Sequence, residues 1–158
     1  MFLNAYNLVC ISYNKLNRIS TLTFLNRTEI VADRKPRELL NSLCKYHGST
    51  YAGRVESMKH LLNIKQKVPV LVCLYMNCIF FPTHCPNSED CIWIQARMVK
   101  RLDYIDSTRT LVQFDNSSIE VNIGIRSIKK QLERCKLYYE KVSCPIDANA
   151  FMRIMGGD

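Results

Sequence analysis

The sequence lacks any uninterrupted apolar run that approaches the ~18 residues of a membrane-spanning helix. Its longest apolar stretch, Val68 to Pro82, is interrupted by Pro69 and Asn77 and has the composition of strands. Residues 1 to 7 have neither a positively charged n-region nor a sustained apolar h-region. We therefore expect no signal peptide, no membrane partner and a cytoplasmic protein.

The sequence also lacks the motifs that assign catalytic roles. It contains no Walker A loop, no Gly-x-Gly-x-x-Gly and no nucleophile elbow. Only three histidines could act as a base, His47, His60 and His84, and no nucleophile is placed beside them by a recognisable pattern. We predict that the protein is not an enzyme and carries no cofactor.

Its eight cysteines include no C-x2-C pair of the kind that begins most zinc sites. The metal candidate is the group Cys73, Cys78, His84, Cys85 and Cys91, whose four cysteines fall in or beside apolar, strand-like runs. Buried reduced cysteines are therefore favoured over a structural zinc, which stays the alternative.

The remaining composition is typical of one globular domain. The chain has 158 residues, of which 47% are hydrophobic and 23% charged, and it shows no internal repeat or linker. Apolar alternation predicts strands over residues 8–13, 20–25, 29–32, 68–75, 78–82, 91–99, 108–114 and 118–123. The expected class is α+β, a single domain with an antiparallel sheet of about six to eight strands and two or three helices.

Helix signals occur at three places. The first helix has Asp33 as its expected N-cap and Gly48 as its terminator. A second begins near Thr50 or Arg54, with Gly53 assigned to the loop before it. A third, amphipathic helix is expected over residues 126–139, followed by a frayed tail at 156–158.

Positive charge is concentrated in one segment. Residues 34 to 67 hold eight Lys/Arg against Glu38 and Glu56, which accounts for most of the formal charge of +8. By contrast, residues 68 to 96 contain no Lys or Arg, as expected for core strands. The distribution favours a polyanion, nucleic acid first. An anionic membrane surface is the alternative, and it would require a basic amphipathic helix with a second anchor.

Residues 48 to 54, Gly-Ser-Thr-Tyr-Ala-Gly-Arg, carry the best contact candidates in this segment. Glycines allow close backbone approach, and hydroxyls with a guanidinium suit phosphate oxygens. Two DNA-binding modes remain open. In one, the two helices form a helix-turn-helix whose second helix enters the major groove. In the other, the loop grips phosphates or reaches into a minor groove.

Each candidate also has a structural explanation. Tyr51 can pack into the core, Ser49 and Thr50 can be helix N-caps, and Arg54 can pair with Glu56 or Asp33. The basic stripe of the third helix can be a solvated face, a DNA contact or a dimer contact. The predicted DNA-binding residues are Lys45, Ser49, Thr50, Tyr51, Arg54, Lys59, Lys65, Lys67, Arg126, Lys130 and Arg134.

Residues 48 to 54 resemble the Gly-Ser-Ser-Tyr-Ala-Gly-Arg core of the ComK competence transcription factors of Gram-positive bacteria. Three further segments resemble that family in the same order: residues 67–72 its Lys-Pro-Pro segment, 79–83 its Phe-Pro-Thr strand, and 91–94 its Cys-x-Trp-Ile strand. The resemblance covers roughly residues 15 to 140. On this resemblance, we expect residues 1–158 to form one ComK-like DNA-binding domain, with a family-like core at 15–140 and a short C-terminal extension at 141–158.

The resemblance implies a transcriptional activator of DNA-uptake genes. Such a protein would bind A/T-rich promoter boxes in double-stranded DNA, mainly through the minor groove, where negative potential is enhanced. It also implies a homodimer or higher homo-oligomer, control by a proteolytic adaptor, and association with the nucleoid in the cytoplasm. The alternative is a truncated, non-activating relative that acts as a protein-interaction module or modulator of another regulator.

Overall fold

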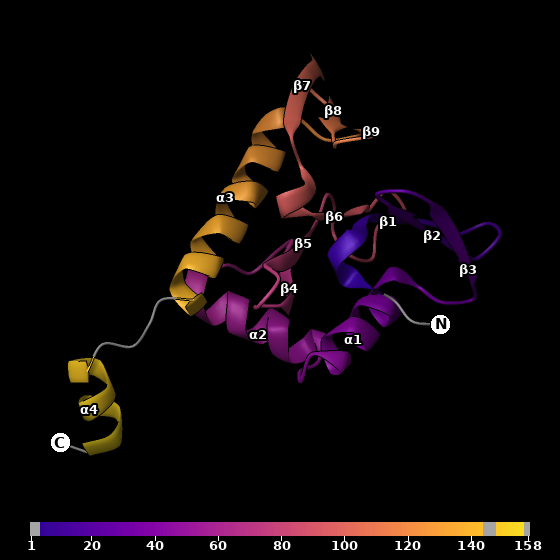
Figure 1. Cartoon of the computed structure of the whole chain (residues 1–158). Coiled ribbons are helices and arrows are strands. Elements are labelled where there is room, and N and C mark those ends of the chain that lie inside the picture. The colour runs from indigo at the N-terminus through magenta and orange to yellow at the C-terminus, as the bar shows by residue number, and fades with distance from the viewer. Residues whose placement is uncertain (1–3, 144–147, 157–158) are drawn as a thin grey trace.

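Residues 4–143 and 148–156, which the computed structural model describes, contain nine strands in two antiparallel sheets (Figure 1). The larger sheet has the order β3-β2-β1-β6-β5-β4 and the smaller the order β7-β8-β9. Their bounds are β1 (Leu8–Asn14), β2 (Ile19–Phe24), β3 (Thr28–Ala32), β4 (Val70–Cys73), β5 (Cys78–Pro82), β6 (Trp93–Gln95), β7 (Arg101–Asp106), β8 (Arg109–Gln113) and β9 (Ser118–Val121). The predicted α+β class, with an antiparallel sheet and a single domain, is confirmed.

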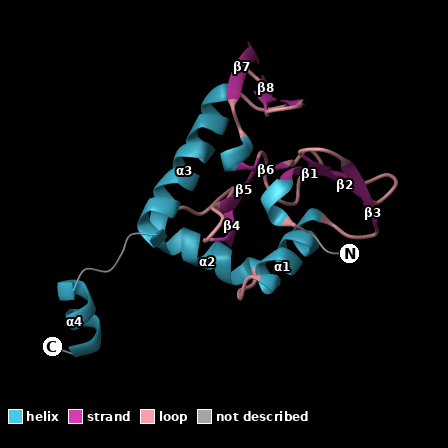
Figure 2. Ribbon diagram, in the orientation of Figure 1, coloured by secondary structure: helices cyan, strands magenta, loops and turns pink. Residues whose placement is uncertain are grey.

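The described residues form four α-helices: α1 (Pro36–Tyr46), α2 (Tyr51–Leu62), α3 (Ile125–Ser143) and α4 (Ala148–Gly156). Figure 2 shows α1 and α2 one after the other along one side of the molecule and α3 along an adjacent side, with the sheets inside the angle. None of the described helices has the length and apolarity that crossing a membrane requires.

The central strands of the large sheet are buried on both faces. Val70, Phe80 and Trp93 pack on one face in the cluster that includes residues of α1. Their neighbours Leu71, Phe81 and Ile94 pack on the opposite face, against residues of α2 and α3. Because both faces of these strands are covered, every position of β4 and β5 is apolar, as the sequence analysis expected for residues 68 to 82.

The strand predictions need two corrections: one predicted strand is too long, and one strand was missed. The strand expected over residues 91–99 is only β6, and a 3-10 turn (Ala96–Met98) follows it. Trp93, Ile94 and Gln95 are all buried, so their alternation does not separate a core face from a solvent face. The Gln95 amide donates hydrogen bonds of 3.0 and 2.5 Å to the carbonyls of Ala5 and Leu8. Strand β7 was not predicted, because its exposed and half-buried residues are mixed without a clean period of two.

The helix boundaries also differ from the predictions. Asp33 is not the N-cap of α1: it has φ +58° and pairs with Arg18 at 3.3 Å. The cap position belongs to Lys35, whose N–H donates to the Glu38 carboxylate at 2.7 Å. Helix α3 is longer than predicted at both ends. The expected frayed tail begins at the last residue of the unpredicted α4, and its residues 157–158 lie outside the described part of the chain.

Six of the seven described cysteines are buried, and the exception is Cys85. Burial raises the pKa of the Cys44 and Cys91 thiols to about 11. Buried thiols of this kind behave as small apolar residues, which confirms the core interpretation for Cys73, Cys78 and Cys91. In the part of the chain that the structure describes, no three His, Cys, Asp or Glu side chains gather as a metal site would require.

Candidate nucleic-acid interface

Gly48 ends α1 in a Schellman motif. Its φ of +84° lies in the left-handed region that glycine adopts without strain. The Ser49 N–H donates to the Cys44 carbonyl at 3.0 Å, and the Gly48 N–H donates to the Lys45 carbonyl at 3.2 Å. Gly48 therefore terminates the helix as predicted, and it turns the chain directly into α2.

Thr50 is the N-cap of α2. Its hydroxyl oxygen accepts a hydrogen bond of 3.0 Å from the Gly53 N–H, and Asn41 Oδ1 accepts one of 2.9 Å from the Tyr51 N–H. Gly53 thus lies inside the helix and not in the loop. A Cβ at Gly53 would come within 3.2 Å of Thr50 Oγ1, so the close packing of this turn favours glycine.

Replacing Thr50 by alanine is expected to lower the free energy of unfolding by about 1 kcal/mol, because one N-terminal N–H of α2 loses its acceptor. Thr50→Ser keeps the oxygen and is the matched control, expected to stay within about 0.5 kcal/mol of wild type. Urea unfolding of both variants measures the difference. Equal stability of the alanine and serine variants would show that the cap contributes nothing.

Tyr51 and Arg54 lie on the first turn and a half of α2. The half-buried Tyr51 ring meets Trp93 edge to face at 6.1 Å, and the Arg37 guanidinium lies 5.0 Å from the Tyr51 ring centroid. Burial raises the pKa of Tyr51. Arg54 is half-buried, forms no ion pair with Glu56 or Asp33, and has a buried Nε without a hydrogen-bond partner in the described chain. Tyr51 therefore packs against the core, whereas Arg54 retains donor capacity.

A second group of predicted residues lies at the far end of α2. Here Gln131 of α3 donates hydrogen bonds to the carbonyls of Lys67, at 2.8 Å, and Pro82, at 2.9 Å. The half-buried Arg134 donates to the Gln66 carbonyl at 3.2 Å. These bonds fasten α3 to the loop that follows α2. Exposed Lys65 lies in that loop, one residue from the Arg134 contact.

The predicted contact residues thus fall into two groups. The α2 N-terminal group holds Lys45, Ser49, Thr50, Tyr51 and Arg54, and the α2–α3 group holds Lys59, Lys65, Lys67, Arg126, Lys130 and Arg134. The twelve residues of α2 span about 18 Å. Arg126 lies a further ~12 Å along α3 from Arg134. The structure therefore spreads these residues along α2 and α3 and does not gather them at one point.

Charge is strongly segregated between helices and strands. Residues 34–67 and 125–143, which contain α1, α2 and α3, hold fourteen of the 22 Lys/Arg but only four of the 14 Asp/Glu. All seven ion pairs of the described residues lie outside these two segments. Carboxylates therefore neutralise cations in the strands and turns but leave those of α1 to α3 uncompensated. Such a surface attracts a polyanion.

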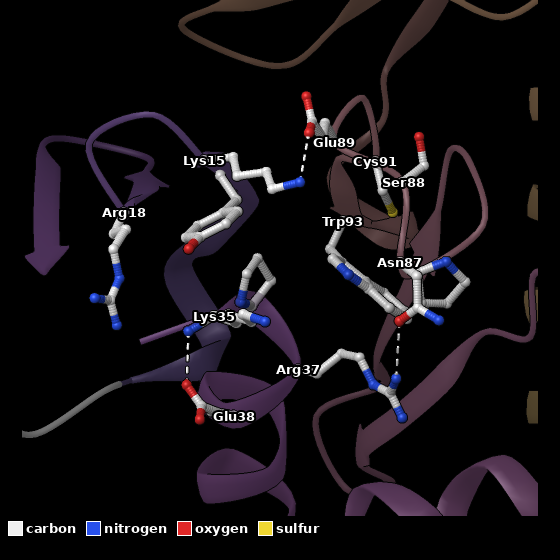
Figure 3. Close-up of a pocket in the computed structure, with 13 residues that line it drawn as sticks. Lys15, Arg18, Lys35, Arg37, Glu38, Asn87, Ser88, Glu89, Cys91 and Trp93 are labelled. Carbon is white, nitrogen blue, oxygen red and sulfur yellow. Dashed lines mark hydrogen bonds and ion pairs between the residues drawn. The ribbon is translucent and has the colours of Figure 1, made fainter. Parts of the chain in front are cut away.

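The structure adds two features that the sequence analysis did not find. One is Gln131, a buried amide on α3. The other is a cavity of about 750 Å³, here named the α1 pocket, between the β1–β2 turn, the start of α1 and the loop at residues 83–91 (Figure 3). Lys15 and Arg18 line it together with Lys35 and Arg37. No local pattern marks Lys15 and Arg18, because their partners lie on other elements.

Comparison with known proteins gives a consistent result. A family model described as "ComK protein" matches residues 2–146. The chain is similar to a "Competence transcription factor" of Bacillus subtilis (strain 168), with 29% identity over 114 residues. That alignment covers 72% of this chain and 59% of the relative, so it spans about three fifths of the relative's length. No solved structure matches.

Proposed function

The chain belongs to the ComK family, and from this membership we propose that it is a DNA-binding transcriptional activator of competence genes. It binds A/T-rich promoter boxes through the minor groove and the phosphate backbone, as a homodimer or higher homo-oligomer. It acts in the cytoplasm on the nucleoid, catalyses no reaction, and is a substrate for adaptor-directed proteolysis. The name of the Bacillus subtilis relative supports the regulatory part of this proposal.

The observation that carries the proposal is the segregation of charge. Binding to duplex DNA is driven largely by cations that release counterions from phosphates. The cations of α1 to α3 are available for this because no carboxylate pairs with them in the described chain. A/T-rich DNA adds a narrow minor groove whose potential attracts Arg and Lys.

Within the α2 N-terminal group, the residues have different proposed roles. Arg54 is the direct contact, because it lies near the start of α2 and forms no ion pair within the described residues. Its Nε is buried, so the terminal nitrogens of the guanidinium make the contact. Lys45 and Ser49 contact phosphates beside it. Thr50 and Tyr51 act indirectly, by fixing the start of α2. The Thr50 oxygen accepts the capping hydrogen bond from the Gly53 N–H, and the Tyr51 ring packs against Trp93.

A mobility-shift comparison tests the proposal. Wild-type protein is expected to bind a duplex with A/T boxes at least about tenfold more tightly than a scrambled G·C-rich duplex of equal length. Arg54→Ala is expected to lose about tenfold or more on the A/T duplex. Lys100→Ala, which removes an exposed cation beside the small sheet, is the matched control and should bind as wild type does.

Two outcomes would contradict this function. Equal binding to both duplexes would remove sequence specificity and leave a general polyanion-binding protein. No binding to either duplex, in a protein whose circular dichroism shows native folding, would favour the alternative of a protein-interaction module that modulates another regulator.

A further inference from the structure

The α1 pocket has the size of a small-molecule site. Its volume of about 750 Å³ falls in the ~300–1,000 Å³ range of ligand pockets. Two side-chain bridges fix its outline (Figure 3). Lys15 Nζ meets Glu89 at 2.9 Å on one side, and Arg37 donates to Asn87 Oδ1 at 3.3 Å on the other. The β1–β2 turn, α1 and the 83–91 loop are therefore held together around the opening.

The polar lining of the pocket favours an anion. Four cations line it, of which Lys15 pairs with Glu89 and Arg18 pairs with Asp33, so Lys35 and Arg37 are the lining cations without an ion pair in the described residues. The second lining carboxylate, Glu38, accepts from the Lys35 N–H. The Lys35 ammonium forms no ion pair with any described residue.

The apolar lining favours a flat ring. The half-buried Tyr13 and Pro86 offer ring surface to the pocket, whereas Pro36 and Trp93 line it from the protein interior and are themselves buried. Ring systems pack well on aromatic and proline surfaces of this kind. The pocket thus has cations on one side and the rings of side chains on another. This arrangement suits a ligand that combines a phosphate with a planar heterocycle.

Arg37 is held in place before any ligand arrives. Its guanidinium lies over the Tyr51 ring at 5.0 Å and bonds to Asn87. A side chain fixed in this way loses little conformational entropy when it binds an anion.

We propose that the α1 pocket binds a free nucleoside monophosphate, with Lys35 and Arg37 at the phosphate and the Tyr13 and Pro86 rings at the base, next to the buried Trp93. The pocket lies at the opposite end of α1 from the turn at Gly48, about 16 Å away along the helix. Arg37 and Trp93 of its lining nevertheless contact Tyr51, the first residue of α2. The proposal does not depend on DNA binding, and its test contains no DNA in the first stage.

Trp93 makes the test specific, because it is the single tryptophan of the chain. AMP titrated into the full-length protein, with excitation selective for tryptophan, is expected to change the Trp93 emission in a saturable way. Adenosine lacks the phosphate and inorganic phosphate lacks the base, so each should bind at least about tenfold more weakly than AMP. Lys35→Ala and Arg37→Ala should each weaken AMP binding by about tenfold.

Lys100→Ala is the matched control, since it removes an exposed lysine outside both the pocket lining and the proposed DNA contacts and should leave AMP binding unchanged. A loss in Lys100→Ala as large as that in Lys35→Ala would overturn the site in favour of general charge attraction. If inorganic phosphate bound as tightly as AMP, the proposed contact between the base and the side-chain rings would be wrong. In a second stage, duplex DNA that displaces AMP would overturn the small-ligand site and assign the pocket to a DNA interface. An emission that AMP does not change in folded protein would overturn the proposal entirely.

Discussion

A variant that replaces Lys59, Lys65, Arg126 and Lys130 by alanine is expected to bind duplex DNA on the order of a thousandfold more weakly than wild type near 0.15 M salt. If the wild type makes about six phosphate contacts, its log K falls against log salt with a slope near −5, and each lost contact reduces that slope by about 0.9. The variant should therefore show a slope between about −1 and −2. Mobility shifts at four or five salt concentrations measure it.

This prediction isolates the DNA interface because the four side chains are exposed and form no ion pair within the described residues. Each substitution should then change stability by no more than about 0.5 kcal/mol. The control removes the same charge from strands and turns, through alanine at Arg27, Lys100, Arg101 and Arg109. An equal loss of affinity in the control would assign the binding to net charge, and an unchanged slope in the first variant would exclude the α2–α3 group.

The elements that the sequence predicted well are those with local signals. Pro36 and Gly48 bracket α1, and both act within one turn of the helix end. The hairpin of β4 and β5 was predicted because its apolar runs are continuous and its turn is short. In these cases the residues that determine where a helix ends or a strand turns lie within a few positions of that helix end or turn.

The elements that the sequence predicted poorly depend on distant partners. Strand β6 is short because it fits between β1 and β5, whose residues lie more than ten positions away in the chain. The alternation of apolar and polar residues over 91–99 predicts one buried face and does not reveal that the second face of β6 is buried as well. Likewise Asp33 has the right chemistry for an N-cap, but its pairing with Arg18 from the preceding hairpin sets it in a turn.

The same distinction applies to the candidate interface. The charge cluster at residues 34–67 and the stripe on α3 are visible in the sequence, because charge adds up regardless of fold. How these two groups of cations lie relative to each other in space cannot be predicted from the sequence. It depends on Gln131, a polar residue on a helix whose hydrogen-bond partners are 64 and 49 residues away. Sequence patterns treat such a residue as surface, whereas the structure buries it.

Gln131→Ala is expected to lower the free energy of unfolding by about 2 to 4 kcal/mol, because the Lys67 and Pro82 carbonyls lose their donor while they stay inside the protein. For a chain of this size that corresponds to a fall in Tm of roughly 5 to 15 °C. Gln66→Ala is the matched control, since Gln66 is exposed and only its backbone carbonyl takes part in the Arg134 contact. It should unfold within about 0.5 kcal/mol of wild type.

Gln131→Glu distinguishes lost hydrogen bonds from lost volume, because it keeps the size of the side chain. A buried carboxylate that faces two carbonyl oxygens is desolvated and repelled, which raises its pKa in the folded state above the unfolded value. The half-buried Arg134 guanidinium, which donates to Gln131 Oε1 at 3.2 Å, acts in the opposite direction but is screened by solvent. The stability of this variant should therefore increase as pH falls through that raised pKa, where the protonated acid donates one bond. Gln131→Ala should show no such dependence beyond that of wild type. If both variants matched Gln66→Ala in stability at every pH, Gln131 would contribute nothing to the position of α3. The apolar contacts of Ile128, Cys135 and Tyr138, with the hydrogen bonds of Tyr138 to Ser57 and of Arg134 to the Gln66 carbonyl, would then hold the cations of α3 relative to α2.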